Sequence, residues 1–232
     1  RILVHYASLT GKRGLTGSDL FVKAYRDNPK TDFHQMVADI AKIPRKQAKV
    51  MNLALMYGMG QTRLAESLDV TVEEAKGLIR QYHQQVPFVK ELMDSVQRHV
   101  GGPMGSGFVR SLLGRKCRFN LWEPNLFVSS KALPKEQATI EYGNNIKRAY
   151  TYKSLNRVIQ ASAADQAKKA MCEIYKTGKV PLIQIHDELA FSVKDLEEAQ
   201  ALQEIMETCV KLQVPSPTDA ALGPNWGNLK EA

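Results

Sequence analysis

The spacing of apolar residues changes sharply along this chain, from helical periodicity to a short β-rich segment near residues 180–193. Apolar residues recur at helical spacing over much of residues 32–176, with glycines and prolines between the segments. Two β-rich runs then follow, separated by His186, Asp187 and Glu188, and such a pair is typical of a hairpin. The pattern predicts a mainly helical chain with at least one antiparallel hairpin.

Local signals set the boundaries of the predicted helices. Pro44 suits the first turn of a helix, because its missing N–H would be unpaired there. Thr71 and Glu74 have the spacing of a capping box, which marks a helix start. Residues 101–124 are rich in glycine and basic residues and are predicted to form loops and short strands. The predicted helices span residues 32–42, 45–57, 71–87, 88–99, 135–176 and 195–211.

The charge balance narrows the classes of partner. The 232 residues include 32 Lys and Arg against 24 Asp and Glu, a net charge of +8. This excess favours polyanionic partners, nucleic acid first, although a basic but otherwise ordinary surface has the same composition. The three cysteines are dispersed, and the sequence has no secretory signal and no apolar run long enough to span a membrane. We therefore expect a cytoplasmic protein without a disulfide framework, a zinc site or a membrane partner.

A stripe on the predicted helix over residues 45–57 is the first candidate binding surface. Arg45, Lys49, Leu53 and Tyr57 recur every four residues, so each lies about 40° around the helix from the one before. The two cations fall in the first turns, where the helix dipole favours an anion. An acidic ligand such as a triphosphate would also relieve the repulsion between them. A solvated basic face is the alternative interpretation.

The predicted hairpin holds the second candidate site. Asp187 and Glu188 are adjacent at the exposed end of a β element. Mg²⁺ is commonly bound by one or two carboxylates together with substrate phosphates, so this pair can form half of a metal site. A two-metal site needs a further carboxylate from another segment. The alternative is a polar turn without metal, because so short a motif has little specificity.

Three further groups are candidates either for contact with nucleic acid or for a structural role. Arg115 and Lys116 lie in a predicted loop, where phosphate contact and simple solvation are both open. Asn156 and Gln160 stand four residues apart on a predicted helix, and amides placed this way can bond base edges or decorate the helix surface. His34 lies on an apolar-patterned helix, where a single histidine is more often structural. The chain contains no P-loop, nucleophile-elbow or zincin motif.

Five segments together resemble the family A (polymerase I-like) DNA polymerases of bacteria and phages. The segments are DFHQMVAD, PRKQAKVMNLALMYGMG, SLLGRK, LNRVIQASAADQAKKAM and QIHDELAF. Their order and approximate spacing match that family over nearly the whole chain, as far as the terminal GPNWGNL. Each segment alone is weak evidence, whereas five in order are specific. The resemblance implies a DNA polymerase and favours the functional interpretation of each group above.

The resemblance assigns a nucleotide-binding role to the stripe. It implies that Arg45 and Lys49 bind the incoming triphosphate, with Lys49 taking part in catalysis, and that His34 also faces the phosphates. It further implies that Tyr57 stacks at the insertion site. Leu53, however, stands where the best-known members have Phe or Tyr against the nucleotide sugar, and in this respect the chain resembles certain phage enzymes. This departure leaves discrimination at the nucleotide 3′-OH open.

The resemblance also assigns residues to DNA and to metal. It implies DNA contacts for Gly58, Arg115, Lys116, Asn156, Gln160 and His186. Asp187 and Glu188 would be catalytic ligands of two Mg²⁺ ions. The first motif of the family, Asp-Tyr-Ser-x-x-Glu-Leu, would end just before Arg1, because RILVHYAS resembles the residues that follow that motif. We therefore expect a missing polymerase segment, in the same chain or a separate one, to supply the second carboxylate.

The predicted architecture is α+β, with a helical fingers subdomain over residues 15–149 inserted into a palm that has an antiparallel sheet. Residues 1–14 and 150–232 would form the palm. The predicted reaction is template-directed addition of deoxynucleotides to a primer 3′-OH with release of pyrophosphate, in a bacterial cell or phage-infected host. The partners would be primer-template DNA, deoxynucleoside triphosphates (dNTPs) and the missing segment. The alternative is a catalytically incomplete nucleic-acid-binding accessory chain. A nucleotide-binding regulator would explain the helix stripe only.

Overall fold

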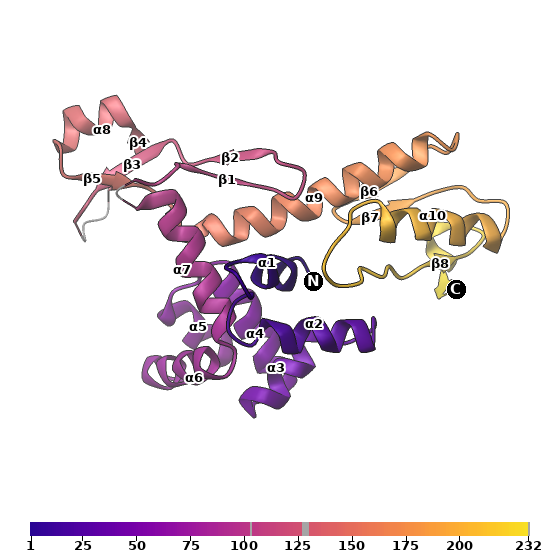
Figure 1. The fold of residues 1–232 in the computed structure, drawn as a ribbon, viewed down its shortest axis with the longest axis horizontal. Coiled ribbons are helices and arrows are strands. Elements are labelled where there is room, and N and C mark those ends of the chain that lie inside the picture. Colours follow the sequence, from indigo (N-terminus) through magenta and orange to yellow (C-terminus); the bar gives the residue numbers. More distant parts are fainter. Residues whose placement is uncertain (103, 127–129, 232) are drawn as a thin grey trace.

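The computed structural model describes residues 1–102, 104–126 and 130–231 and has the α+β fold that the sequence predicts (Figure 1). The α-helices are α1 (Ile2–Leu9), α2 (Ser18–Asp27), α3 (Phe33–Ala41), α4 (Arg45–Met56), α5 (Gln61–Leu68), α6 (Val72–Gln85), α7 (Pro87–Gly101), α8 (Lys135–Tyr142), α9 (Ser154–Tyr175) and α10 (Leu196–Thr208). Short 3₁₀ helices occupy η1 (Thr151–Lys153) and η2 (Trp226–Asn228). Among the described residues, no helix has both the length and the apolar composition that a membrane crossing requires.

The strands form small antiparallel sheets. They are β1 (Phe108–Arg110), β2 (Lys116–Arg118), β3 (Leu121–Pro124), β4 (Leu133–Pro134), β5 (Ile146–Arg148), β6 (Ile183–Ile185), β7 (Glu188–Ala190), β8 (Ala221–Leu222) and β9 (Lys230–Glu231). β1 pairs with β2, β6 with β7 and β8 with β9, while β3 lies between β4 and β5. The hairpin predicted near residues 180–193 is thus confirmed as β6–β7.

Capping explains where several helices begin. The Asp32 side chain accepts hydrogen bonds from the amides of His34 and Gln35, which would otherwise be unpaired at the start of α3. Thr71 and Glu74 form the predicted capping box at the start of α6. These boundaries therefore follow from local chemistry that the sequence shows.

The main hydrophobic core lies where α1, α2, α3, α4, α6 and α7 meet. Its largest fully buried side chains include Phe21, Met51, Tyr82 and Phe88. Leu155 brings the start of α9 into the same core. A second, smaller cluster joins α7, α9 and the β1–β2 region through Val100, Val109, Phe119 and Val158.

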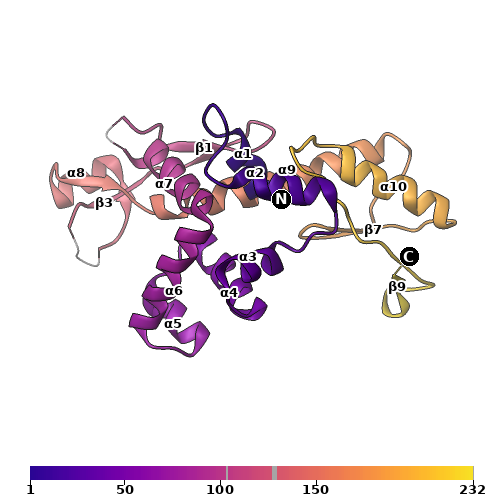
Figure 2. The same cartoon turned by 60° about the horizontal axis from the view of Figure 1, so that its bottom comes forward.

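The long helix α9 connects the parts of the molecule. In Figure 1 the β1–β2 hairpin runs beside it, the sheet of β3, β4 and β5 with α8 lies toward one end, and α10 with the β6–β7 hairpin lies toward the other. Figure 2 shows α5 and α6 extending away from this axis, with α3 and α4 between them and the α10 side.

One predicted helix is wrong in part. The sequence predicts helix over residues 135–176, but α8 ends at Tyr142, and Gly143 follows with a φ of 74°. The chain then forms β5, which pairs with β3, before α9 begins at Ser154. Strand pairing and a glycine in a conformation that other residues rarely adopt override the helical pattern there. α2 and α5 have no counterpart among the predicted helices, and α5 buries only Leu64 and Ala65.

Candidate nucleotide-binding cavity and nucleic-acid interface

The predicted stripe lies on the exposed side of α4. Arg45, Lys49, Leu53 and Tyr57 are all exposed, and Tyr57 is the residue immediately after the helix. The opposite face is buried in the main core and carries Ala48, Met51, Asn52, Ala54 and Leu55. Leu53 and Tyr57 remain 38% and 48% exposed, so both have surface available to a ligand. The helix thus offers two cations, an aliphatic and an aromatic side chain on one open side.

The two cations of the stripe differ in their partners. Arg45 Nε donates to Asp32 Oδ2 at 2.8 Å, and the other oxygen of Asp32 caps α3. Burial alone would raise the pKa of the Asp32 carboxyl, but hydrogen bonds from Arg45 and the α3 amides outweigh it and lower that pKa. Lys49 has no ion pair within the described part of the chain. Lys49 is therefore the stripe cation with its charge uncompensated.

His34 is held by a hydrogen bond from the buried side of α4. Asn52 Nδ2 lies 2.9 Å from His34 Nδ1, and the Tyr82 hydroxyl donates to Asn52 Oδ1 at 2.6 Å. Asn52 and Tyr82 are each only 1% exposed. These contacts link α3, α4 and α6 through polar groups inside the main core.

A cavity of about 440 Å³ brings together residues from several distant parts of the sequence. His34 of α3, Leu53 of α4 and Asp187 of the β6–β7 turn line it. The wall from α9 consists of Ile159, Ala163, Gln166, Ala167 and Ala170. Arg45 and Lys49 are not among its lining residues. The structure thus places three of the predicted site residues around one space beside α9.

The β6–β7 turn has an unusual backbone. Ile185 pairs with Glu188, so the turn contains only His186 and Asp187, and Glu188 belongs to β7 rather than to the turn. His186 has a φ of 54°, a conformation uncommon for any residue other than glycine. Left-handed non-glycine residues are enriched at functional sites, where the surrounding structure holds them. The geometry is consistent with a site at this turn.

The carboxylates predicted to bind metal, Asp187 and Glu188, are not joined by a third ligand among the described residues. Asp187 lines the cavity and its neighbour Glu188 is exposed on β7. Within residues 1–102, 104–126 and 130–231, no three His, Cys, Asp or Glu side chains are grouped closely enough to hold a metal ion. A magnesium site that uses Asp187 would therefore need at least one more ligand from elsewhere.

The end of α4 contacts the start of α9. Gln160 Nε2 donates to Tyr57 Oη at 3.2 Å, and Asn156, one turn earlier on α9, is half-buried. Gly58 has a φ of 67°, and a Cβ there would lie 2.8 Å from Tyr152 Cδ2. The backbone at Gly58 therefore approaches Tyr152 more closely than any other residue type would allow.

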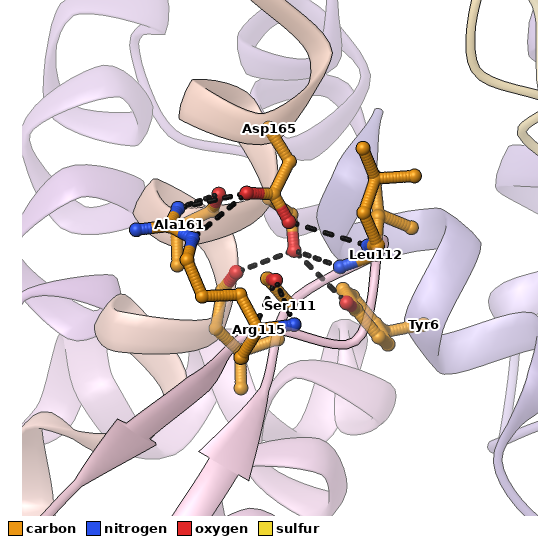
Figure 3. Close-up of polar contacts among 9 residues, drawn as sticks. Tyr6, Ser111, Leu112, Arg115, Ala161 and Asp165 are labelled. Carbon is orange, nitrogen blue, oxygen red and sulfur yellow. Dashed lines mark hydrogen bonds and ion pairs between the residues drawn. The ribbon is translucent and has the colours of Figure 1, made fainter. Parts of the chain in front are cut away.

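The loop between β1 and β2 is fixed to α9 by a polar network, shown in Figure 3. Arg115 Nε donates to Asp165 Oδ1 at 3.0 Å, and another guanidinium nitrogen donates to the Ala161 carbonyl at 2.9 Å. The amide of Leu113 donates to Asp165 Oδ2 at 3.2 Å. Asp165 is 5% exposed. Burial alone would raise its pKa, but hydrogen bonds from Ser111, Leu113 and Arg115 outweigh burial and lower it.

Ser162 extends this network to α1. Its hydroxyl accepts from the Leu112 amide at 3.1 Å and lies 2.9 Å from the Tyr6 hydroxyl (Figure 3). Because the Arg115 guanidinium already bonds Asp165 and the Ala161 carbonyl, only part of its hydrogen-bonding capacity is left for a ligand. Lys116 is exposed, and its Nζ lies 4.7 Å from the centroid of the Phe108 ring. DNA contact by these two residues stays a prediction.

Sequence reasoning missed the buried polar residues behind the site. Asn52 falls among apolar positions on the inner face of α4, and a polar residue at a core position was a usable signal. Asp165 and Ser162 stand among alanines on α9, but their partners come from a loop some 50 positions earlier in the sequence. No local sequence pattern predicts those contacts.

Comparison with known proteins defines the class. A model of the family described as DNA polymerase family A matches residues 13–228. The chain therefore belongs to DNA polymerase family A.

The relatives are longer than this chain. A DNA-directed DNA polymerase of Pseudomonas phage M6 is 34% identical over 268 residues, which cover 98% of this chain and 36% of the relative. DNA polymerase I of Geobacillus stearothermophilus is 29% identical over 99% of this chain and 25% of its own length. One similar solved structure is the POL domain of Pol1 from M. smegmatis, in complex with DNA primer-template and dNTP. It is 27% identical to this chain with a TM-score of 0.66, and the match covers 92% of this chain and 35% of the M. smegmatis chain. The chain thus spans about a third or less of these relatives.

Proposed function

We propose that this chain is part of a polymerase that adds deoxynucleotides to a primer 3′-OH under the direction of a template, with release of pyrophosphate. The observation that carries the proposal is the shared cavity, because His34, Leu53 and Asp187 come from distant segments and meet there beside α9. Family membership supports the reaction class. The M. smegmatis relative was solved with primer-template and dNTP, which supports these two as partners.

The stripe would bind the incoming nucleotide. Lys49 and Arg45 would neutralise the triphosphate, and Lys49 would contribute most as negative charge develops on the leaving phosphates. His34 would donate a hydrogen bond to the same phosphates. Leu53 would contact the sugar, and Tyr57 would stack beside the nascent base pair. In this arrangement the protein acts mainly by positioning and by charge neutralisation.

Asp187, with Glu188 beside it, would bind magnesium. The pair at the end of a hairpin fits the carboxylate chemistry of Mg²⁺ but is incomplete, so a carboxylate from a further polymerase segment would complete the site. When bound, two such ions stabilise the attacking and leaving oxygens of a displacement. His186 would lie by the primer terminus.

The duplex would contact the open side of α9 and neighbouring loops. The residues proposed for DNA contact are Gly58, Arg115, Lys116, Asn156 and Gln160. The net charge of +8 supports a polyanionic partner of this kind. We assign residues 15–149 to the fingers and residues 1–14 and 150–232 to the palm. A bacterial or phage-infected cell would be the setting, as it is for the phage and bacterial relatives.

Primer extension tests the proposal. The completed polymerase for this test joins the chain in frame behind the N-terminal part of the Pseudomonas phage M6 relative, in place of the matching segment. We expect extension by the completed polymerase, loss of extension in its Asp187→Asn variant, and none by the isolated chain, because Asp187 and Glu188 alone are an inadequate ligand set. Tight primer-template binding without extension in any form would favour the accessory-chain alternative, which the incomplete ligand set also supports.

A further inference from the structure

The hydrogen bonds around Asn52 determine which nitrogen of His34 carries its proton. Within the described residues the Tyr82 hydroxyl has no hydrogen-bond partner other than Asn52, so its hydrogen goes to Asn52 and the Asn52 atom facing it is the carbonyl oxygen. The amide nitrogen then faces His34 Nδ1 at 2.9 Å. An amide nitrogen can only donate, and therefore Nδ1 must be the unprotonated, accepting nitrogen of the ring. The proton of a neutral His34 ring is left on Nε2.

Burial favours this one arrangement of donors and acceptors over the reverse. Asn52 and Tyr82 are each 1% exposed, so water is excluded from these groups, and a buried hydroxyl hydrogen without an acceptor is costly. Burial also raises the pKa of the Tyr82 hydroxyl, so it stays protonated and remains the donor that orients the amide. Reversing the Asn52 amide would make the Tyr82 hydroxyl an acceptor and leave its buried hydrogen without a partner within the described residues.

The second nitrogen of His34, Nε2, has no hydrogen-bond partner within the described residues. His34 is half-buried and lines the cavity with Leu53 and Asp187. Nδ1 is occupied by Asn52, and no hydrogen bond involves Nε2 within the described residues. The nitrogen that bears the proton is therefore the one left without a protein partner.

We propose that Asn52 and Tyr82 are positioning residues that hold His34 as the Nε2–H tautomer, with this N–H available to a phosphate oxygen of a nucleotide bound in the cavity. The tautomer rests on contacts of this chain alone. The identity of the ligand rests on the proposed function.

The charges around His34 make the tautomer matter at neutral pH. Burial lowers the pKa of His34; Asp32 opposes this change, while Arg45 and Lys49 add to it. The ring is then mostly neutral and has a single N–H to offer. A neutral ring with its proton on Nδ1 would present a lone pair to a phosphate and repel it.

Nitrogen NMR of the histidine-labelled chain tests the tautomer directly. The chain has five histidines, and the His34 signals are assigned by their loss in His34→Gln. In the unmodified chain we expect a protonated Nε2 and an unprotonated Nδ1 at neutral pH. Protonation at Nδ1 in the unmodified chain would overturn the inference.

Two substitutions test the roles of Asn52 and Tyr82. Asn52→Asp replaces the donor facing Nδ1 with an acceptor of the same shape, so Nδ1 should become protonated and the His34 pKa should rise by about 1–3 units. Tyr82→Phe removes the hydroxyl that orients the amide, so a population protonated at Nδ1 should appear. Tyr142→Phe removes a tyrosine hydrogen bond on exposed α8 and should leave His34 unchanged. An unprotonated Nδ1 in folded samples of both network variants would refute the positioning role.

Addition of dGTP with Mg²⁺ separates this inference from the proposed function. We expect dGTP to shift the Nε2 signal while Nδ1 stays unprotonated. If Tyr82→Phe leaves the two tautomers equally populated, half of the molecules are competent and the Kd for dGTP rises about twofold. Binding of dGTP without any change at Nε2 would overturn the phosphate contact. Absence of dGTP binding would instead count against the proposed function, and the tautomer result would still decide the roles of Asn52 and Tyr82.

Discussion

Replacement of Gly58 by alanine tests the junction between α4 and α9. Gly58 follows the last residue of the stripe, has a φ of 67°, and faces Tyr152 at a distance where a Cβ would lie 2.8 Å from Cδ2 and 3.2 Å from the carbonyl oxygen. Contacts under about 3 Å force a neighbour to move. Because the Tyr152 backbone is also close, rotation of the tyrosine ring alone cannot remove the overlap.

Three contributions set the size of the change in the free energy of unfolding. A left-handed conformation costs an alanine about 1–2 kcal/mol, and the less flexible unfolded chain returns about 0.4–1 kcal/mol. Overpacking adds about 1–3 kcal/mol. We therefore expect Gly58→Ala to lower the free energy of unfolding by about 3 kcal/mol, which for a chain of this size lowers Tm by roughly 6–12 °C.

Urea denaturation followed by circular dichroism measures the effect, with two matched controls. Gly17→Ala shares a positive φ of 77° but meets nothing within 4 Å, so it should show the conformational cost alone. Gly77→Ala, inside α6, has neither feature and should be close to neutral or stabilising. In a Tyr152→Ala background the cost of Gly58→Ala should fall toward that of Gly17→Ala but stay above it, because the carbonyl oxygen of residue 152 remains 3.2 Å from the added Cβ. Equal costs for Gly58→Ala and Gly17→Ala in the unmodified background would refute the close approach.

Three further predictions concern the stripe and the loop network. In the completed polymerase, Lys49→Ala should lower kcat/KM for dNTP at least about a hundredfold and leave the affinity for duplex DNA unchanged. Lys46→Ala, on the same helix, should have little effect on either quantity. A parallel loss of DNA affinity in Lys49→Ala would place Lys49 on the DNA surface instead. Leu53→Tyr should raise the kcat/KM ratio of dideoxy to deoxy substrates by roughly tenfold or more, and an unchanged ratio would mean that Leu53 does not face the sugar. Asp165→Asn should destabilise the chain by about 1.5–3 kcal/mol at neutral pH. Because the folded-state pKa of Asp165 is lowered, its ionised form stabilises the fold above the usual Asp pKa. The difference in the free energy of unfolding between wild type and Asp165→Asn, measured by urea titration, should therefore shrink as pH falls below about 4. A constant difference down to acid pH would argue against an ionised Asp165.

Helix periodicity and caps were sufficient to predict the surface that α4 presents. The four-residue repeat of Arg45, Lys49, Leu53 and Tyr57 depends only on helix geometry, and all four are exposed in the structure. The β6–β7 hairpin was similarly predictable, because its pairing is local in sequence. Predictions of this kind succeed where the residues that decide the structure are close together in the chain.

Contacts between distant segments were not predictable in the same way. The pairing of β5 with β3 interrupts a sequence that otherwise favours helix, and the partner strand lies more than 20 residues earlier. The cavity depends on α3, α4, α9 and a turn near residue 187 meeting in space. The motifs indicated which residues to examine, whereas the side-chain partners of Arg45, Arg115 and His34 required the structure.

Single-nucleotide incorporation by the completed polymerase tests the central claim most directly. Each of the four dNTPs is offered opposite each of the four template bases, in the unmodified form and in Asp187→Asn. If the cavity is the insertion site of a family A polymerase, incorporation follows Watson–Crick pairing with the template and disappears in Asp187→Asn. Incorporation that ignores the template base, or that survives loss of the Asp187 carboxylate at full rate, would contradict the account.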